Sequence, residues 1–436
     1  MERVEITTSV RKSPSMSLRE QTRFVVGFYK ERAVIRYGAH LRRDPLCRLH
    51  LEPGRQNPYP IYDEVRRRGP LIRSALGTWT SATYAICEQV LRDRRFGVDV
   101  RPADQRTGAP LLSFLELDPP DHTRLRRFVM PTFSPKAVAG FDPQITTVVG
   151  QLLDAVPSDG SFDLVGGYAA PMPIAVITRL LGIPDADSEE FERYGQAFGS
   201  ALGGLQSLRH ARELGEAQAR LQRIFGDLIE LRRADPGDDV ISRLVTAPGE
   251  QIHADDIVPL CTLLLIAGFE TTVNLIGNTV HALLRRPELW QRVAEDPTLV
   301  DAAVEETLRF DAPVQRTARV AQADIELGGR LVSQGQMVVA LIGGAGRDPE
   351  TVDRPDEFDL DRAGRDHLAF SAGAHYCVGR PLAKLEATIA VRELVTRFPD
   401  LRIDGRAERR TGTLIRGLAR LPVRTSMAGR RSYATA

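Results

Sequence analysis

The segment at residues 370–386, FSAGAHYCVGRPLAKLE, constrains the fold of this chain more than any other part of the sequence. Its cysteine, Cys377, has glycines nearby on both sides and is followed at once by residues of helical character. Gly373 and Gly379 permit a sharp turn and a close approach of the backbone to a flat cofactor, and Pro381 suits the first turn of a helix. Backbone N–H groups and a helix N-terminus directed at the sulfur would favour the thiolate. A single cysteine cannot build a zinc or iron–sulfur site, but it can be the axial ligand of a haem iron.

Two other roles for Cys377 stay open at this point. A lone cysteine is most often a small buried hydrophobic residue. A cysteine nucleophile would need a histidine base, and His375 is only two residues away, where a contact requires an unusual turn. The remaining cysteines show neither paired metal-ligand spacing nor a disulfide framework, which suits a reducing cytoplasm: Cys47, Cys87 and Cys261.

The overall composition excludes several classes of protein. The 58 basic and 57 acidic side chains nearly cancel over 436 residues, which argues against a nucleic-acid-binding protein. The longest apolar run, residues 257–269, contains Pro259 and is too short to cross a bilayer, and we find no signal peptide. We therefore expect a cytoplasmic protein without a transmembrane anchor.

The first 50 residues are richer in arginine and lysine than in acidic residues. Their apolar residues could form one stripe along a helix, made of Leu18, Phe24, Val25, Phe28 and Ile35. Such a helix would either pack against the body of the protein as a leader or lie on a membrane, and we favour the leader helix.

The pattern of apolar residues predicts a mainly α protein with small β-sheets, the α+β class. Between about residues 140 and 320, segments such as 187–233 and 255–285 carry apolar residues at three- and four-residue steps. Residues 320–342 change to short alternating runs with glycine turns, which predicts a small set of strands. No change in composition separates domains.

A second chemically suggestive segment, AGFETT at residues 267–272, lies in one of these predicted helices. Ala267 and Gly268 would leave a gap where a ligand approaches the backbone, with the acid Glu270 and the alcohol Thr271 beside it. Threonine hydroxyls can bond back to the preceding turn and open it, which would create a path for protons. The alternative is a glycine at a close helix crossing beside a solvated glutamate.

Two further pairs have helical spacing. Glu306 and Arg309 are three residues apart and can form an ion pair. His122 and Arg126 are four residues apart, so two donors on one face could bind a pair of carboxylates. Solvated helix surfaces explain such pairs equally well when each is considered alone.

The order of these motifs resembles the cytochrome P-450 superfamily, the haem-thiolate monooxygenases, and in particular its soluble bacterial branch. AGFETT, ETLR and FSAGAHYCVG stand in that family's order, and the resemblance extends from about Asn57 to Val423. Weaker matches lie between them, among them DPPDHTRLRR, LLGIP, GRDP and FDLDR. The resemblance implies a triangular, helix-rich prism with the haem between distal and proximal helices.

The resemblance also implies roles for individual residues. Cys377 would be the proximal thiolate ligand of the iron in haem b (iron protoporphyrin IX), with Phe370 packed beside it. The other expected cofactor-binding residues would hold the haem propionates, turn the loop or face the ring: His122, Arg126, Ala267, Gly268, Arg319, Gly373, His375 and Gly379. A structural Glu–Arg–Arg network would contain Glu306, Arg309 and Arg362. The family usually has glycine where this chain has Ser371, so a positive φ there would add strain of about 1 kcal/mol.

The activity implied is oxygen activation by haem, with the catalytic residues Thr271 and Glu270. Thr271 would hydrogen-bond dioxygen or a water at the haem, and Glu270 would relay protons from outside. The product would be a hydroxylated or epoxidised hydrophobic small molecule, as in secondary metabolism. Two alternatives remain: an enzyme that catalyses oxidative coupling without oxygen insertion, and a non-catalytic haem-binding sensor.

The remaining expectations concern partners and boundaries. We expect a monomeric enzyme that receives electrons from a separate ferredoxin and ferredoxin reductase. A basic patch could attract this acidic partner, and it would consist of Arg124, Arg127, Arg380 and Lys384. Arg316 would either meet a polar substrate group or face solvent. We expect an N-terminal extension with a leader helix at residues 1–56, the monooxygenase domain at 57–423 and a flexible tail at 424–436.

Overall fold

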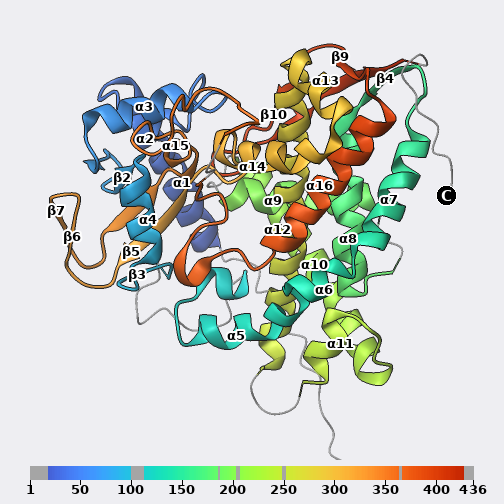
Figure 1. Ribbon diagram of the computed structural model, residues 1–436. Helices are drawn as coiled ribbons and strands as arrows, with labels where there is room; N and C mark the ends of the chain where they lie inside the picture. Colours follow the sequence, from blue (N-terminus) through green and yellow to red (C-terminus); the bar gives the residue numbers. More distant parts are fainter. Residues whose placement is uncertain are drawn as a thin grey trace, which may run out of the picture.

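The computed structural model describes residues 18–99, 112–184, 187–202, 207–247, 252–362 and 366–426. The predicted mainly α architecture with small sheets is confirmed: the long helices pack together on one side, the largest sheet and β6–β7 lie on the other, and β4 and β9 lie beside the long helices (Figure 1). The α-helices are α1 (Leu18–His40), α2 (Pro45–Arg48), α3 (Tyr59–Arg68), α4 (Tyr84–Arg92), α5 (Asp121–Val129), α6 (Pro135–Ala139), α7 (Asp142–Ala155), α8 (Pro171–Leu181), α9 (Ser188–Leu202), α10 (Leu208–Ala234), α11 (Val240–Val245), α12 (Ala254–Leu284), α13 (Pro287–Glu295), α14 (Val300–Phe310), α15 (Ile342–Ala345) and α16 (Arg380–Arg397).

Short helices of other types connect these elements. The 3₁₀ segments are η2 (Ser113–Glu116), η3 (Met130–Phe133), η5 (Pro297–Leu299) and η6 (Gly373–His375), and η4 (Val165–Ala169) is a π-helix. The strands are β1 (Ile72–Arg73), β2 (Trp79–Ser81), β3 (Phe96–Gly97), β4 (Gly160–Asp163), β5 (Thr317–Ala321), β6 (Ile325–Leu327), β7 (Arg330–Val332), β8 (Met337–Ala340), β9 (Arg402–Ile403), β10 (Glu408–Arg409), β11 (Leu418–Arg420) and β12 (Pro422–Thr425).

The largest sheet has five strands in the order β1-β2-β8-β5-β3. Its β2–β8 pair is parallel, and the β5–β8 pair is antiparallel with Arg319 opposite Val338. A three-stranded sheet has the order β4-β12-β9, and β6-β7 and β10-β11 form two-stranded hairpins. The strands predicted at residues 320–342 are therefore present as parts of β5 to β8.

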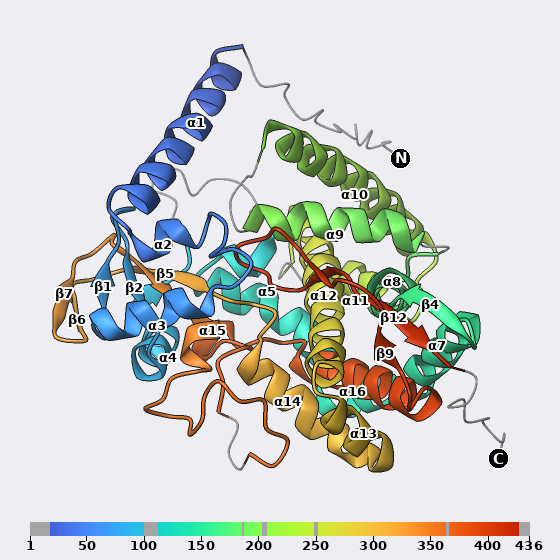
Figure 2. The same ribbon diagram turned by 90° about the horizontal axis from the view of Figure 1, so that it is seen from above.

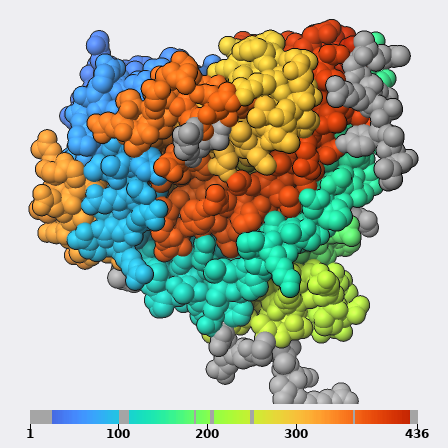
Figure 3. Space-filling model, viewed as in Figure 1, coloured from blue at the N-terminus to red at the C-terminus, as the bar shows by residue number. Residues whose placement is uncertain are grey.

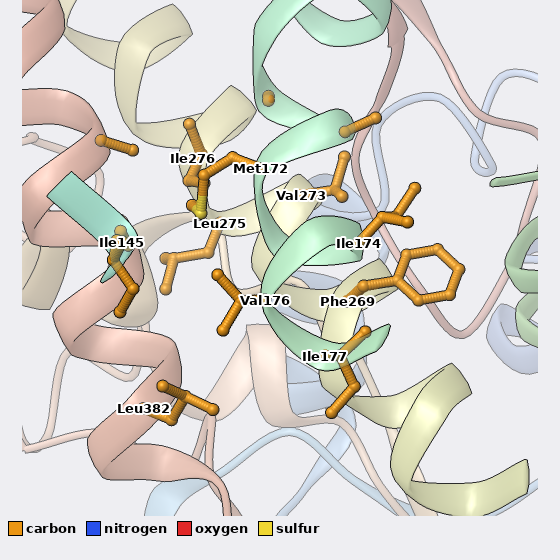
Figure 4. Packing of buried hydrophobic residues seen from close by; sticks show 14 of the residues in the cluster. Ile145, Met172, Ile174, Val176, Ile177, Phe269, Val273, Leu275, Ile276 and Leu382 are labelled. Atoms are coloured by element: carbon orange, nitrogen blue, oxygen red, sulfur yellow. The ribbon is translucent and has the colours of Figure 1, made fainter. Parts of the chain in front are cut away.

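Helix α12 runs through the middle of the molecule and positions the site. It contacts α8, α9, α14 and α16, and Figure 4 shows Phe269, Val273 and Ile276 of α12 among side chains of α8. Its N-terminus is capped by Asp256, whose side chain accepts a hydrogen bond from the backbone N–H of His253 (3.2 Å). Although α12 is apolar and long enough to cross a bilayer, 83% of its apolar window is buried inside the protein.

Both ends of the chain refine the expected boundaries. The predicted N-terminal helix exists as α1 and packs on α2, with Phe28 and Ile35 buried. The side chains of Leu18 and Phe24, also expected in its stripe, lie outside the described part of the structure. Strand β12 continues to Thr425, which pairs with Gly160, so the expected flexible tail cannot begin at residue 424. Residues 427–436 lie outside the described range.

Candidate active site

Cys377 lies in a closed loop between η6 and α16. Its backbone N–H donates to the carbonyl oxygen of Phe370 (2.9 Å), which closes the hairpin. Gly373 has φ 67°, and a Cβ there would lie 2.3 Å from the carbonyl oxygen of Leu91, so only glycine fits. The loop has the sharp turn and the following helix that the sequence predicted.

Ser371 has the strained backbone conformation that was expected if this position requires a positive φ. Its φ is 62°, a left-handed conformation that L side chains rarely adopt. Its hydroxyl lies 3.5 Å from the guanidinium of Arg319, at the edge of hydrogen-bonding distance. The strain predicted for serine at this position is therefore present.

The protonation of the thiol differs from the expectation. Burial raises the pKa of Cys377 above its ordinary value, although backbone N–H groups of Gly379 and Arg380 and the charge of Arg126 act to lower it. The turn and helix N-terminus are directed at the sulfur as predicted, but desolvation outweighs them. A cation at the sulfur is what would make the thiolate the stable form.

Four basic side chains predicted to hold carboxylates come together from separate elements. The rings of His122 (α5) and His375 (η6) have centroids 4.3 Å apart. Both ring nitrogens of His122 and Nε2 of His375 are buried. Within the described residues, none of these three atoms has a hydrogen-bond partner. Arg319 on β5 is 5% exposed, and its hydrogen bonds to Thr317, Ala318 and Ser371 all go to neutral oxygens. Arg126 donates to the carbonyl oxygen of Tyr376 beside them.

The two arginines give this cluster its positive charge, and the two histidine rings are neutral at neutral pH. Burial, followed by Arg319, His122 and Arg126, lowers the pKa of His375 to about 3. Burial also lowers the pKa of Arg319 to about 10 and that of His122 below its ordinary value. Buried donors without acceptors cost free energy until an anion pairs with them. The cluster therefore fits the two propionates of a haem.

Helix α12 has an exposed position in the middle of its length. Ala267 is exposed although it lies in the middle of a largely buried helix, and Thr271 is one turn further along. The Thr271 hydroxyl donates to the carbonyl oxygen of Ala267 (2.9 Å). The α12 ladder nevertheless stays helical through this turn, so the expected opening is not seen. Together with the thiol and the unpaired donors, this exposed position fits a flat haem.

Gly268 does not contribute to that exposed position as expected. A Cβ on Gly268 would lie 2.8 Å from Cδ1 of Ile177 on α8. Its role is a close helix–helix crossing, which was the alternative considered for this segment. Of the two residues predicted to leave a gap for a ligand, Ala267 is the one that is exposed.

Glu270 points from α12 towards α9 and is 4% exposed. Among the described residues its Oε2 has no hydrogen-bond partner. Burial raises the pKa of Glu270 to about 8, with Arg410 opposing the rise and Glu192 adding to it. Arg410 pairs with Glu192 at 3.1 Å. The acid is thus mainly protonated at neutral pH and close to an ion pair.

Gly199 on α9 makes room for this acid. A Cβ on Gly199 would lie 1.8 Å from Oε2 of Glu270. One turn earlier, Gly195 accommodates the ring of Phe269 in the same way, because the ring Cζ lies 2.1 Å from the point that a Cβ would occupy. Gly199, Glu192 and Arg410 were not predicted from the sequence, because no local motif links them to residue 270; the four-residue glycine spacing in α9 was the available signal.

The Glu–Arg–Arg network is present and fully buried. Arg309 donates from Nε and NH2 to both oxygens of Glu306 (2.9 and 2.8 Å), and Arg362 donates to the same carboxylate (3.2 Å). Arg309 also donates to the carbonyl oxygens of Gly346 and Glu357. The network ties α14 to the loop that precedes the cysteine segment.

The expected basic patch is partly neutralised. Arg124 pairs with Asp256 (2.8 Å), and Lys384 pairs with Glu305. Arg380 lies over the rings of Phe370 and Tyr376, and Arg127 over that of Phe128. Figure 3 shows the residue 370–400 region reaching the surface between α5 and the α13–α14 region.

Arg316 does not face solvent, because it is 8% exposed. It donates to the Thr413 hydroxyl (2.9 Å) and lies 3.2 Å from Nε2 of His50. The family resemblance implies that the substrate region includes residues 96–117 and 190–215, of which residues 100–111 and 203–206 lie outside the described ranges.

A loop-held cysteine before α16, buried basic donors without partners among the described residues and an exposed position on a long buried helix fit a haem-thiolate oxidoreductase. The chain belongs to the cytochrome P450 family. The family model "Cytochrome P450" matches residues 207–411, and the relatives below cover most of the chain. It is accordingly a haem-dependent monooxygenase.

The similarity extends over nearly the whole length of the relatives. The chain is 37% identical over 396 residues to cytochrome P450 monooxygenase PikC of Streptomyces venezuelae (86% of this chain, 94% of the relative). It is 36% identical over 384 residues to vitamin D(3) 25-hydroxylase of Pseudonocardia autotrophica (84% and 94%). The ligand-free crystal structure of Mycobacterium smegmatis CYP164A2 matches with TM-score 0.81 and 40% identity, over 87% of this chain and 99% of that one.

Proposed function

We propose that this protein binds haem b and inserts one oxygen atom from O2 into a hydrophobic small molecule, by hydroxylation or epoxidation. The observation that carries the proposal is the pairing of a loop-held cysteine at the start of α16 with a buried acid and an alcohol on α12. When bound, the haem supplies the activation of dioxygen. The protein supplies ligation, dryness and control of protons.

The residues divide the binding of the haem among them. Cys377 would provide the axial sulfur, with the N–H groups of Gly379 and Arg380 hydrogen-bonded to it. His122, His375, Arg126 and Arg319 would pair with the propionates, which would satisfy the ring nitrogens that lack partners among the described residues. Ala267 would leave room for the ring.

Proton delivery would follow from the two neighbouring side chains on α12. Glu270 carries its proton at neutral pH because burial raises its pKa to about 8, so it can donate at Oε2 without first taking up a proton. The Thr271 hydroxyl would hold a water or dioxygen on the open side of the helix. The Arg410–Glu192 pair beside Glu270 would reload the acid from the surface.

The class of substrate follows from the family and from the relatives. The names of these relatives identify PikC as a monooxygenase and the other as a hydroxylase of vitamin D(3). We extend this to a hydrophobic secondary metabolite for the present chain. We further propose a cytoplasmic monomer that receives electrons from a ferredoxin and its reductase, which would dock at the basic surface that includes Arg380.

Oxygen insertion can be tested directly. Macrolides, steroids and fatty acids would first be screened for a substrate-induced spin-state shift in the haem spectrum. Turnover of the ligand so found, under isotopically heavy dioxygen, is expected to place one heavy oxygen atom in the product. A product that gains a new carbon–carbon or carbon–oxygen bond without any heavy oxygen would replace this proposal with oxidative coupling.

A further inference from the structure

Helix α1 has two opposed apolar faces, and only one of them is packed against the protein. On the inner face, Phe28 and Ile35 are 9% exposed each. Large apolar side chains on the outer side stay in contact with solvent: Val26 (60%), Tyr29 (59%), Val34 (41%) and Tyr37 (52%), continued by Leu41 (73%) just after the helix. Figure 2 shows α1 projecting from the β-rich side of the molecule.

The geometry of the helix makes this outer row continuous. At about 100° per residue, Val26 and Tyr37 point within about 20° of each other, while Ile35 points about 180° away. Single exposed apolar residues are ordinary, whereas a contiguous row on one face marks an interaction surface. The inner face is sufficient to attach α1 to the body, so the outer row serves no packing within the described structure.

Basic side chains accompany this row. Between residues 25 and 43 the chain carries a single acidic residue, Glu31, against five basic ones: Lys30, Arg32, Arg36, Arg42 and Arg43. Lys30 falls within the outer row and Arg36 along its border, and both are exposed. Tyrosine rings favour the boundary between lipid and water, and long basic side chains can bury their stems while their charges reach phosphate groups.

We propose that the outer face of α1 binds the surface of a membrane that contains anionic phospholipids. A second copy of the chain would bring Lys30 and Arg36 of both copies into one interface, which opposes self-association through this face. An anionic bilayer complements both the charge and the apolar row. Peripheral attachment would hold the enzyme where hydrophobic small molecules partition, and it is independent of which substrate the haem site accepts.

The test is flotation of the haem-loaded, full-length protein with phosphatidylcholine vesicles, with and without about one third phosphatidylglycerol. We expect the protein to bind the anionic vesicles at least about tenfold more tightly than the neutral ones, and to be released by salt. Two variants should each weaken binding about tenfold: Tyr29→Ser/Tyr37→Ser, which removes the apolar contact, and Lys30→Gln/Arg36→Gln, which removes charge.

The matched control is Leu208→Ser/Leu231→Ser, which removes two exposed leucines (39% and 49%) from α10. It should float like the unmodified protein. The carbon monoxide spectrum of every variant reports that the haem site is intact. Absence of anionic-vesicle binding by the unmodified protein, or equal binding by the α1 variants and the control, overturns the proposal. The proposal would also be overturned if the unmodified protein did not bind vesicles but formed a dimer that Tyr29→Ser/Tyr37→Ser dissociates. The outer face of α1 would then bind a second copy of the chain.

Discussion

The carboxylate of Glu270 occupies the space that a side chain on Gly199 would need, with Oε2 1.8 Å from the position of an added Cβ. Helix α9 is therefore in direct contact with the proposed proton-donating group on α12. Gly195, one turn earlier, fits against Phe269 in the same manner. The position of α9 and the conformation of Glu270 depend on each other.

The variant Gly199→Ala should retain haem but lose efficient turnover. The carboxylate is the end of a flexible side chain, so it would move away rather than force the helices apart. Because general acid catalysis contributes on the order of a hundredfold or more, we expect at least about a tenfold drop in product formed per electron consumed. Product yield per reduced nicotinamide oxidised is the measurement.

Gly226→Ala provides the control for that variant. Gly226 lies in α10, and an added Cβ there meets nothing within 4 Å. Alanine should raise stability by up to about 1 kcal/mol through helix propensity and leave coupling unchanged. Normal coupling in Gly199→Ala would show that Glu270 has no part in proton delivery from its present position.

The raised pKa of Glu270 predicts a specific dependence of stability on pH. Between the unfolded value near 4.5 and the folded value of about 8, the folded protein holds a proton that the unfolded chain has lost. The free energy of unfolding should therefore fall as pH rises through this interval, by up to about 1.4 kcal/mol per pH unit. Glu270→Gln removes this contribution.

We expect the stability difference between Glu270→Gln and the unmodified protein to grow in favour of the variant from about pH 5 to pH 8, by a few kcal/mol in total. Urea unfolding at a series of pH values measures it. Glu213→Gln, at an exposed position of α10 paired with Arg209, should change nothing comparable. Parallel pH profiles for the unmodified protein and Glu270→Gln would contradict the buried, protonated state.

The strained serine in the cysteine loop predicts a stabilising substitution. Glycine adopts the φ of 62° found at Ser371 without strain, but it also costs more conformational entropy on folding. The net gain for Ser371→Gly should be about 0.5–1 kcal/mol, measured as a shift of the denaturant midpoint. Ala374→Gly in η6, where φ is not positive, should instead destabilise the loop. A loss of stability in Ser371→Gly would show that the weak contact with Arg319 outweighs the strain.

Features that depend on residues close together in the sequence could be predicted, whereas features that depend on contacts between distant segments could not. The cysteine hairpin and the Glu306–Arg309 pair follow from short spacings, and the structure contains both. The strain at Ser371 was expected from the family resemblance, on the condition of a positive φ, which the structure has. The contact between Gly268 and Ile177 was not predicted, because a sequence does not say which side of a helix meets a neighbour and Ile177 lies about ninety residues away along the chain. The backbone N–H groups lower the pKa of Cys377 as expected, but the larger opposing effect of burial was not predicted, since burial depends on the whole fold.

The buried network on α14 predicts a large loss of stability when its arginine is removed. Arg309→Met would leave the carboxylate of Glu306, which is not exposed, with one fewer cation, and several carbonyl oxygens without donors. We expect about 3–5 kcal/mol of destabilisation and weakened haem retention. Arg354→Gln is the control, since Arg354 pairs with three acids but is 55% exposed, so its loss should cost less than about 1 kcal/mol. Equal losses in the two variants would contradict a special role for the buried network.

The central claim is that the sulfur of Cys377 is the axial ligand of the haem iron, and the spectrum of the reduced, carbon-monoxide-bound protein tests it most directly. We predict the absorption band of a thiolate-ligated haem for the unmodified protein, and its loss in Cys377→Ser, where the hydroxyl cannot replace the thiolate. Cys261→Ser, at a buried cysteine of α12, should retain the band if the protein folds. An unchanged thiolate-type spectrum in Cys377→Ser would contradict the account.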